Sequence, residues 1–240
     1  MHRPVKQKTI GILGGMSNQA TAEYYRLLNS EVNRRLGGWE IAETMIAGLN
    51  FGNIEYFVRN EKWDEAGEYL ASKAMAVQSA GADFLLCVSN TMHRVADRFT
   101  RGLSIPFLHI AEPTGTAIIA RRLTRVGLLG TKPVMSAQFL RNHYKRRFGI
   151  DILVPEEADQ CEVDRVIFEE LVRGRMLPES KQRYLAVCRR LQERGAQGVI
   201  LGCTEIFLLV SQSDLPELQC FDTTTLHVTA AVEMALGSAS

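Results

Sequence analysis

The stretch GADFLLCVSNT, from Gly81 to Thr91, carries the pattern that decides the fold. Glycine and alanine open it, a continuous apolar run follows, and short polar residues close it. The same pattern returns as GAQGVILGCTE, from Gly195 to Glu205, displaced by 114 residues. Apolar runs of about four to eight residues with such boundaries are typical of central strands in a parallel sheet. The chain therefore predicts two equivalent buried strands.

A second pair of phrases runs in register with the first. Residues 10–15 read IGILGG and residues 126–131 read VGLLGT, an offset of 116 residues. Helical patterns at 64–80 and 180–194 precede the two Gly-Ala pairs, and glycine is the usual residue just past a helix end. Strands and helices therefore alternate in the same order in both repeats. The sequence predicts an α/β fold of two pseudo-twofold-related, doubly wound domains with parallel sheets.

The repeat also sets the expected domain limits. We expect a first α/β domain from residues 1–114 together with a C-terminal helix in residues 225–240, and a second α/β domain from residues 115–224. Residues 105–109 and 218–222 are predicted to form a further matching pair of strands. Ligands of such sheets bind beyond the carboxyl ends of the strands, so we expect the site in the cleft between the two domains.

Composition narrows the class of protein. The 240 residues are 46% apolar and 23% charged, with a net charge of +1, which is ordinary for a globular chain and gives no reason to expect a nucleic acid partner. A basic cluster, Arg141 and residues 145–147 around Tyr144, is interpreted as a solvated helix face. No apolar run reaches the roughly 20 residues that span a membrane. We therefore expect no nucleic acid and no membrane as partners.

The spacing of cysteines and histidines bears on the cellular compartment and on metal binding. The five cysteines show no Cys-x-x-Cys spacing, which favours a reducing cytoplasm, and the scattered histidines give no metal-ligand pattern. We expect no metal site. Four of the cysteines fall on predicted strands or helix faces and are interpreted as structural: Cys87, Cys161, Cys188 and Cys220.

Cys203 is the strongest candidate for catalysis. It follows a strand and precedes a predicted helix, whose N-terminus lowers the pKa of a thiol. The alternative is a small buried core residue. Ser89 holds the matching place in the first repeat, and its alternative is a helix cap. Both belong to the catalytic prediction because the repeat places them at equivalent strand ends.

Short polar residues surround both candidates. Asn90 and Thr91 follow Ser89, and Thr204 and Glu205 follow Cys203, each pair at a predicted helix N-terminus, an arrangement that suits a carboxylate. Glu205 either orients Cys203, binds a substrate ammonium or caps a helix. The loop 14–21 supplies further backbone donors. His93 and Asp222 are predicted as supporting residues, and residues 50–63 as a mobile cover that selects the substrate side chain.

These phrases resemble a known family. NTMH at 90–93, LGCTE at 201–205, GILGGMS at 11–17, LGT at 129–131 and FDT at 221–223 are similar to cofactor-independent aspartate/glutamate racemases over nearly the full length, and to a subset with a hydroxyl residue in place of one cysteine. The resemblance implies α-proton removal by a thiolate and reprotonation on the opposite face, without pyridoxal phosphate, metal or other cofactor. It also implies a set of residues that hold the substrate's carboxylate and ammonium: Met16, Ser17, Asn90, Thr91, Thr131, Thr204 and Glu205.

The chain departs from the family pattern in two places. Ser89 stands where the family has its first cysteine. The basic residues expected for a distal carboxylate are missing, with no arginine in residues 48–51 and Val172 in place of a lysine. A thiol can be tuned to a thiolate near neutral pH, whereas an alcohol cannot. We therefore predict a directional racemase for a small acidic amino acid, with Cys203 as base and Ser89 as proton donor, and with the L isomer preferred by resemblance.

Two alternatives stay open at this point. One is a one-cysteine decarboxylase or cis–trans isomerase of the same superfamily, and the other is a non-catalytic protein that binds a small carboxylate. Amino-acid racemisation, CO₂ release and thiol titration distinguish them. We also expect a homodimer.

Overall fold

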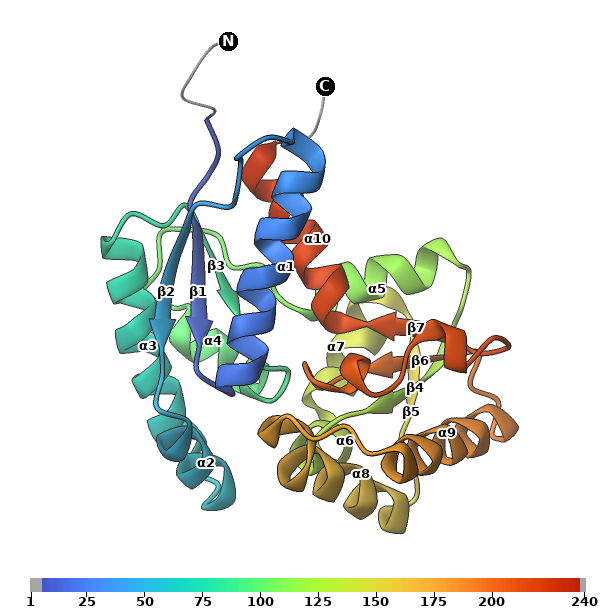
Figure 1. The fold of residues 1–240 in the computed structure, drawn as a ribbon. Helices are drawn as coiled ribbons and strands as arrows, with labels where there is room; N and C mark the ends of the chain where they lie inside the picture. The colour runs from blue at the N-terminus through green and yellow to red at the C-terminus, as the bar shows by residue number, and fades with distance from the viewer. Residues whose placement is uncertain (1–5, 238–240) are drawn as a thin grey trace. The chain divides into compact units, whose positions relative to one another are not determined.

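The computed structural model describes residues 6–237, which divide into two compact units. The first unit comprises the chain up to His109 together with residues from His227 onward, and the second comprises Ile110–Leu226. Each unit is an α/β layer structure with its own parallel sheet (Figure 1). The divisions differ slightly from the expected limits. The predicted breaks at 114/115 and 224/225 fall inside helices α5 (Ala111–Ala120) and α10 (Thr223–Leu236).

The first unit has three parallel strands in the order β2-β1-β3. Its sheet is extended only by an isolated parallel bridge between Leu85 and Phe107. In chain order its elements are β1 (Ile10–Gly14), α1 (Asn18–Leu36), β2 (Thr44–Gly48), α2 (Phe51–Arg59), α3 (Trp63–Ser79), β3 (Phe84–Cys87), the 3₁₀ helix η1 (Thr91–Val95) and α4 (Ala96–Phe99), completed by most of α10.

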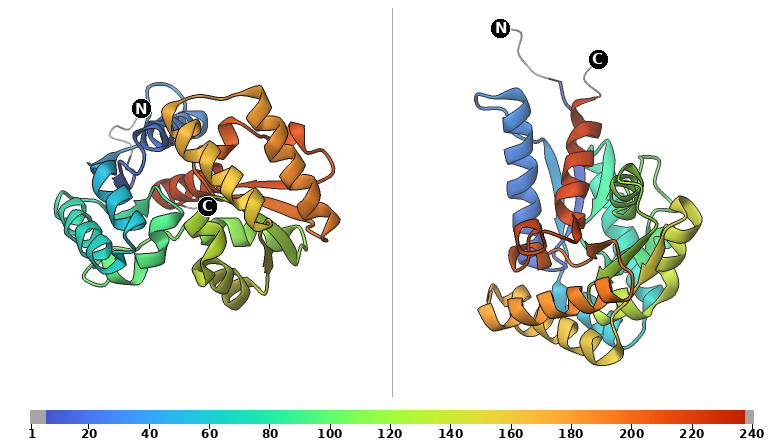
Figure 2. Two further views of the ribbon diagram at one scale, coloured as in Figure 1. Left: turned by 90° about the horizontal axis from the view of Figure 1, so that it is seen from below. Right: turned by 90° about the vertical axis from the view of Figure 1, so that its right-hand side faces the viewer.

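Alternation along β1 and β3 distributes their side chains to two cores. Ile10, Ile12 and Leu86 face a cluster built with α1 and α10, which run side by side in both sets of views (Figures 1 and 2). Leu13 and Cys87 face the opposite cluster, built with α3 and α4. The C-terminal helix therefore packs on the first sheet, as the sequence predicts.

The second unit has four parallel strands in the order β5-β4-β6-β7. Helices α5 and α7 cover one face of this sheet, and α8 and α9 cover the other. Its elements after α5 are β4 (Arg125–Leu129), α6 (Lys132–Ser136), α7 (Gln138–Phe148), β5 (Asp151–Leu153), α8 (Glu157–Glu169), η2 (Leu171–Arg173), α9 (Pro178–Glu193), β6 (Gly198–Leu201), η3 (Ile206–Leu208), η4 (Gln212–Asp214) and β7 (Gln219–Asp222).

Strand pairing confirms the internal repeat. Leu13 of β1 pairs with Cys87 of β3, and Leu129 of β4 pairs with Leu201 of β6, so β1-β3 and β4-β6 correspond in register. The neighbouring strands, β2 and β5, lie on the same side of their partners. The expected strand 105–109 is wrong in extent: only Phe107 forms a bridge. The preceding Pro106 has no N–H to donate to a ladder, whereas its counterpart β7 is a full strand.

A glycine sets the close approach between two strand ends in the first unit. Gly15 has φ +81°, and a Cβ built on it would lie 2.1 Å from the Leu49 carbonyl oxygen. The Leu49 N–H donates to the Gly14 carbonyl at 2.9 Å, which holds the residue after β2 against the end of β1. Glycine at position 15 is therefore required by backbone contact and by a left-handed conformation.

The remaining sequence interpretations concern the surface. On α7, residues 145–147 are exposed while Tyr144 is buried, which confirms that the basic cluster lies on a solvated helix face. Among the helices of residues 6–237, none is both long and apolar enough to cross a membrane.

Candidate active site

Cys203 lies two residues beyond the end of β6, where the backbones at Gly130 and Gly202 are in close contact. A Cβ atom built on Gly130 would lie 2.9 Å from the Gly202 carbonyl oxygen, and one built on Gly202 would lie 2.7 Å from the Leu129 carbonyl oxygen. Neither position therefore tolerates a side chain without a shift. The ends of β4 and β6 are thereby held together, and Gly202 N–H donates to the Leu129 carbonyl at 2.6 Å. This contact fixes the backbone that presents Cys203.

The three residues at this strand end form a buried polar cluster. Cys203, Thr204 and Glu205 are 7%, 5% and 2% exposed. The Cys203 thiol donates to Glu205 Oε2 at 3.1 Å, and the Thr204 hydroxyl donates to the same oxygen at 2.8 Å. Of the roles that the sequence left open for Glu205, this geometry matches the orientation of Cys203.

The electrostatics of Cys203 differ from the sequence prediction. Burial raises the pKa of the Cys203 thiol well above its ordinary value, and the Glu205 carboxylate raises this pKa further by its charge and by accepting the S–H bond. The Glu205 backbone N–H lowers this pKa, as expected of a helix N-terminus, but burial outweighs it, and residues 206–208 form only a 3₁₀ turn, whose dipole is small. The raised pKa of Cys203 favours the thiol over the thiolate.

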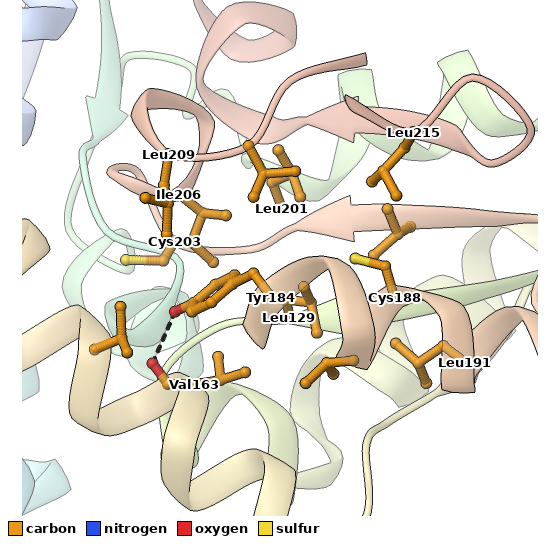
Figure 3. Close-up of a cluster of buried hydrophobic side chains, with 14 of the residues drawn as sticks. Leu129, Val163, Tyr184, Cys188, Leu191, Leu201, Cys203, Ile206, Leu209 and Leu215 are labelled. Carbon is orange, nitrogen blue, oxygen red and sulfur yellow. Dashed lines mark hydrogen bonds between the residues drawn. The ribbon is translucent and has the colours of Figure 1, made fainter. Parts of the chain in front are cut away.

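Figure 3 shows the surroundings of Cys203 in the second unit. Its side chain lies at the edge of an apolar cluster, with the sulfur pointing away from Leu201 and the Tyr184 ring nearby. The Tyr184 hydroxyl donates to the Val163 carbonyl at 2.8 Å. The nearby carboxylate of Asp164 adds to the raised pKa of Cys203. Tyr184 and Asp164 were missed from the sequence, since each lies on a helix that the chain path alone does not connect to Cys203.

Two further predicted residues follow neighbouring strands of the same sheet. Thr131 follows β4 and precedes α6, and its carbonyl accepts the Val134 and Met135 N–H groups at 2.9 and 3.0 Å. Asp222 ends β7 and caps α10, accepting the Thr224 and Thr225 N–H groups at 3.0 and 3.2 Å. Within the second unit, the structure thus brings Thr131, residues 203–205 and Asp222 to one sheet edge.

The first unit carries the matching strand end. Ser89 lies two residues beyond Cys87, as Cys203 lies two beyond Leu201, so the two residues occupy equivalent places in the paired strands. Ser89 and Asn90 are 9% and 4% exposed. The Ser89 hydroxyl accepts the Met92 N–H at 3.4 Å, a capping contact to η1. An α-helix N-terminus was expected here as well, and this too is wrong because a 3₁₀ turn precedes α4.

His93 holds the Ser89 backbone in place. Its Nδ1 lies 2.7 Å from the Ser89 carbonyl oxygen, and since a carbonyl only accepts, Nδ1 donates. The His93 side chain is 4% exposed. The supporting role predicted for His93 therefore has a defined contact, to the carbonyl of Ser89.

The β1–α1 loop completes this edge of the first sheet. Ser17 caps α1, its hydroxyl accepting the Ala20 N–H at 3.2 Å, and Met16 is buried in the core beside α3. Thr21 ties the loop together by donating to the Ser17 carbonyl at 2.8 Å and accepting the Gly15 N–H at 2.7 Å. Met16, Ser17, Ser89, Asn90 and Thr91 therefore all follow neighbouring strands of one unit.

The comparisons with known proteins identify the family. The model of the Asp/Glu/Hydantoin racemase family matches residues 13–231, most of the chain. The chain belongs to this family.

Individual relatives agree with this family assignment. A crystal structure of a candidate Asp/Glu racemase from Yersinia pestis is 37% identical with a TM-score of 0.88, covering 96% of this chain and 100% of that one. The structure of an aspartate racemase homologue from Pyrococcus horikoshii OT3 is 32% identical with a TM-score of 0.81, covering 95% and 98%. The broad specificity amino-acid racemase RacX of Bacillus subtilis is 23% identical over 213 residues, which are 86% of this chain and 90% of RacX.

The other cysteines of this racemase family member lie on regular elements, as predicted. Cys87 belongs to β3 and Cys188 to α9, and burial raises the pKa of Cys188 to about 12 and that of Cys87 further. Cys161 is exposed on α8, and Cys220 lies on β7. In the described part of the chain, no group of three histidine, cysteine or carboxylate side chains is placed to hold a metal ion.

The segment predicted as a mobile cover has regular structure. Residues 51–59 form α2, which Asn50 caps by accepting the Gly52 N–H at 3.0 Å, and the helix buries its own Ile54. The amphipathic pattern of FGNIEYFVR is the sequence signal for this helix. The role of residues 50–63 as a mobile cover stays a prediction.

Proposed function

We propose that this protein is a cofactor-independent amino-acid racemase for a small acidic amino acid such as aspartate or glutamate. In this proposal Cys203 removes the α-proton and Ser89 returns a proton on the opposite face. Membership of the racemase family supports the reaction class. The equivalence of Ser89 and Cys203, each two residues past paired strands, carries the assignment of the two roles.

The proposed cycle begins with the Cys203 thiol. It must lose its proton before it acts as a base, and Glu205 Oε2 at 3.1 Å is the acceptor in place. A substrate ammonium beside this carboxylate would offset the negative charge that raises the pKa of Cys203, which favours the thiolate. The thiolate then takes the α-proton and becomes a thiol again, and Ser89 donates its hydroxyl proton to the carbanion. The Ser89 alkoxide recovers a proton from solvent, and Glu205 releases to solvent the proton that it accepted from Cys203. We propose that the substrate is held by Met16, Ser17, Asn90, Thr91, Thr131 and Thr204.

The change of residue between the repeats supports a directional enzyme. A serine hydroxyl has no accessible anionic form near neutral pH, so removal of an α-proton on the Ser89 face is slow, while protonation from that face is feasible. We propose that the L isomer is the substrate deprotonated by Cys203.

Deuterium incorporation in D₂O tests this proposal. We expect a panel of L amino acids to contain at least one that incorporates α-deuterium much faster than its D isomer, followed initially at equal concentrations. Ser89→Cys is expected to raise the initial rate with the D isomer by about tenfold or more, since a thiol replaces an alcohol as base. Equal initial rates for D and L isomers in the wild-type protein would contradict the directional mechanism. CO₂ release without exchange would indicate a decarboxylase, and neither reaction would indicate a binding protein.

Glu205→Gln tests the electrostatic coupling to Cys203. The substitution removes a charge that raises the pKa of the thiol, so the thiolate fraction at a given pH increases and the alkylation curve moves to lower pH. We expect iodoacetamide to modify Cys203 several-fold faster at pH 8 in the variant, measured by mass spectrometry of the Cys203 peptide. The exposed Glu179→Gln on α9 is the control for loss of one carboxylate. An unchanged or alkaline-shifted curve would rule out the assigned coupling.

We further propose a cytoplasmic homodimer. The five cysteines are free, which supports a reducing compartment. Light scattering of the purified 26.8 kDa chain measures the number of copies directly.

A further inference from the structure

Three histidines of the first unit lie in one group. The ring centroids of His93 and His109 are 4.4 Å apart, with the rings inclined at 72°, and those of His93 and His227 are 6.4 Å apart. His93 belongs to the strand end that carries Ser89, and His109 lies beside β3 in the segment after Phe107. His227 belongs to the distant C-terminal helix α10. The proposed proton transfers use none of these rings, so their grouping needs another explanation.

The hydrogen bonds of His227 define its protonation. Its Nε2 lies 2.9 Å from the Leu108 carbonyl oxygen, which only accepts, so Nε2 carries the hydrogen. Its Nδ1 then accepts from the Tyr24 hydroxyl of α1 at 3.0 Å. The ring is fully buried, and burial lowers the pKa of His227 to about 4. Near neutral pH the ring is therefore neutral, with one donor and one acceptor both engaged.

The Leu108 carbonyl belongs to a segment fixed against β3. Leu108 N–H donates to the Leu85 carbonyl at 3.0 Å, and Leu85 N–H donates to the Pro106 carbonyl at 2.8 Å. His109 follows directly and contacts the His93 ring, which in turn donates to the Ser89 carbonyl. A continuous set of contacts thus runs from α1 and α10 through the segment 106–109 to the backbone of Ser89. The His227 bond to the Leu108 carbonyl adds to the two backbone bonds with Leu85 and ties this segment to α10 as well as to β3.

We propose that His227 is a positioning residue for the proton-donating side of the reaction: its bond to Leu108 sets His109 and His93, and through them the placement of Ser89. This inference rests on the proposed function. Tyr24 sets the tautomer of the His227 ring and is secondary, because its loss leaves the Leu108 bond in place. Cys203 belongs to the other unit, and we expect its proton abstraction to be unaffected by changes at His227.

Three matched variants separate the effects of the two hydrogen bonds of the His227 ring, to Leu108 and to Tyr24. His227→Asn keeps an acceptor near the Nδ1 position and loses the donor to Leu108. His227→Gln keeps an N–H near the Nε2 position and loses the acceptor for Tyr24, and Tyr24→Phe loses only the hydroxyl. We expect kcat with the L isomer to fall about tenfold in His227→Asn and by no more than about threefold in the other two, since only the first releases Leu108.

Isotope effects show which step has slowed. If Ser89 is displaced, protonation limits turnover: in His227→Asn the effect of α-deuterium in the substrate falls toward 1, and the solvent deuterium effect rises. A general loss of folded protein lowers kcat and leaves both isotope effects unchanged, so that pattern overturns the inference, as does equal behaviour of His227→Asn and His227→Gln. If His227→Asn does not fold, His109→Leu removes the ring that contacts His93 and must show the same isotope pattern. Absence of exchange in the wild-type protein would instead reject the proposed function itself.

Discussion

Replacing Cys203 with serine is expected to lower turnover of the L isomer by at least about 10³-fold, because an alcohol cannot supply the base that the thiol supplies. The substitution exchanges sulfur for oxygen in a side chain that already donates to Glu205, so the hydrogen bond can be kept and the fold preserved. Exchange of the α-proton, followed by NMR in D₂O, measures the loss. Thermal unfolding of the variant confirms that the protein is intact.

The matched control is Cys161→Ser. Cys161 is an exposed cysteine on α8 and belongs to no candidate site, so this variant is expected to retain wild-type turnover. Activity of Cys203→Ser within about tenfold of wild type would exclude Cys203 as the base, because general-base catalysis contributes more than this.

Gly15→Ala is expected to destabilise the protein by about 2–5 kcal/mol. A left-handed conformation costs an alanine about 1–2 kcal/mol, and forcing a methyl group against packed atoms adds about 1–3 kcal/mol. Here the clash is with the backbone of Leu49, which cannot rotate away as a side chain can. Urea unfolding followed by circular dichroism measures the change in the free energy of unfolding.

Gly149→Ala separates the two contributions. Gly149, after α7, has φ +72° in the left-handed region, but a Cβ built there meets nothing within 4 Å. This variant is expected to lose only the conformational contribution, about 1–2 kcal/mol. Equal destabilisation of the two variants would show that the contact with Leu49 relaxes without cost.

The repeat made much of the fold predictable. The two Gly-Ala phrases and their apolar runs located β3 and β6, and the register between β1 and β3 or β4 and β6 follows from the same offsets. Helices α3 and α9 were recognisable because each ends before a glycine with positive φ. The strand at 105–109 was overestimated, because strand periodicity does not register the missing N–H of Pro106.

The electrostatics of the candidate site were harder to predict from the sequence than the fold. The residues after Cys203 have the pattern of a helix start, but residues 206–210 are apolar without a polar face. Ile206, Leu209 and Val210 are buried in the core, and residues 206–208 form a 3₁₀ turn rather than a surface helix. The pKa of Cys203 depends on burial and on the direction of the Glu205 side chain, neither of which a linear pattern contains. His227 escaped notice for a related reason, since its partners Tyr24 and Leu108 are 203 and 119 residues away in the chain.

The C-terminal helix α10 belongs largely to the first unit, and this has a consequence for biosynthesis. The second unit is complete once Leu226 has been made, whereas the first still lacks Val228, Ala231 and Val232, which close the core between α1 and the sheet. During synthesis, the core of the first unit can therefore close only after α10 has been made, later than that of the second unit. A premature stop before α10 would leave this apolar face of the first sheet uncovered.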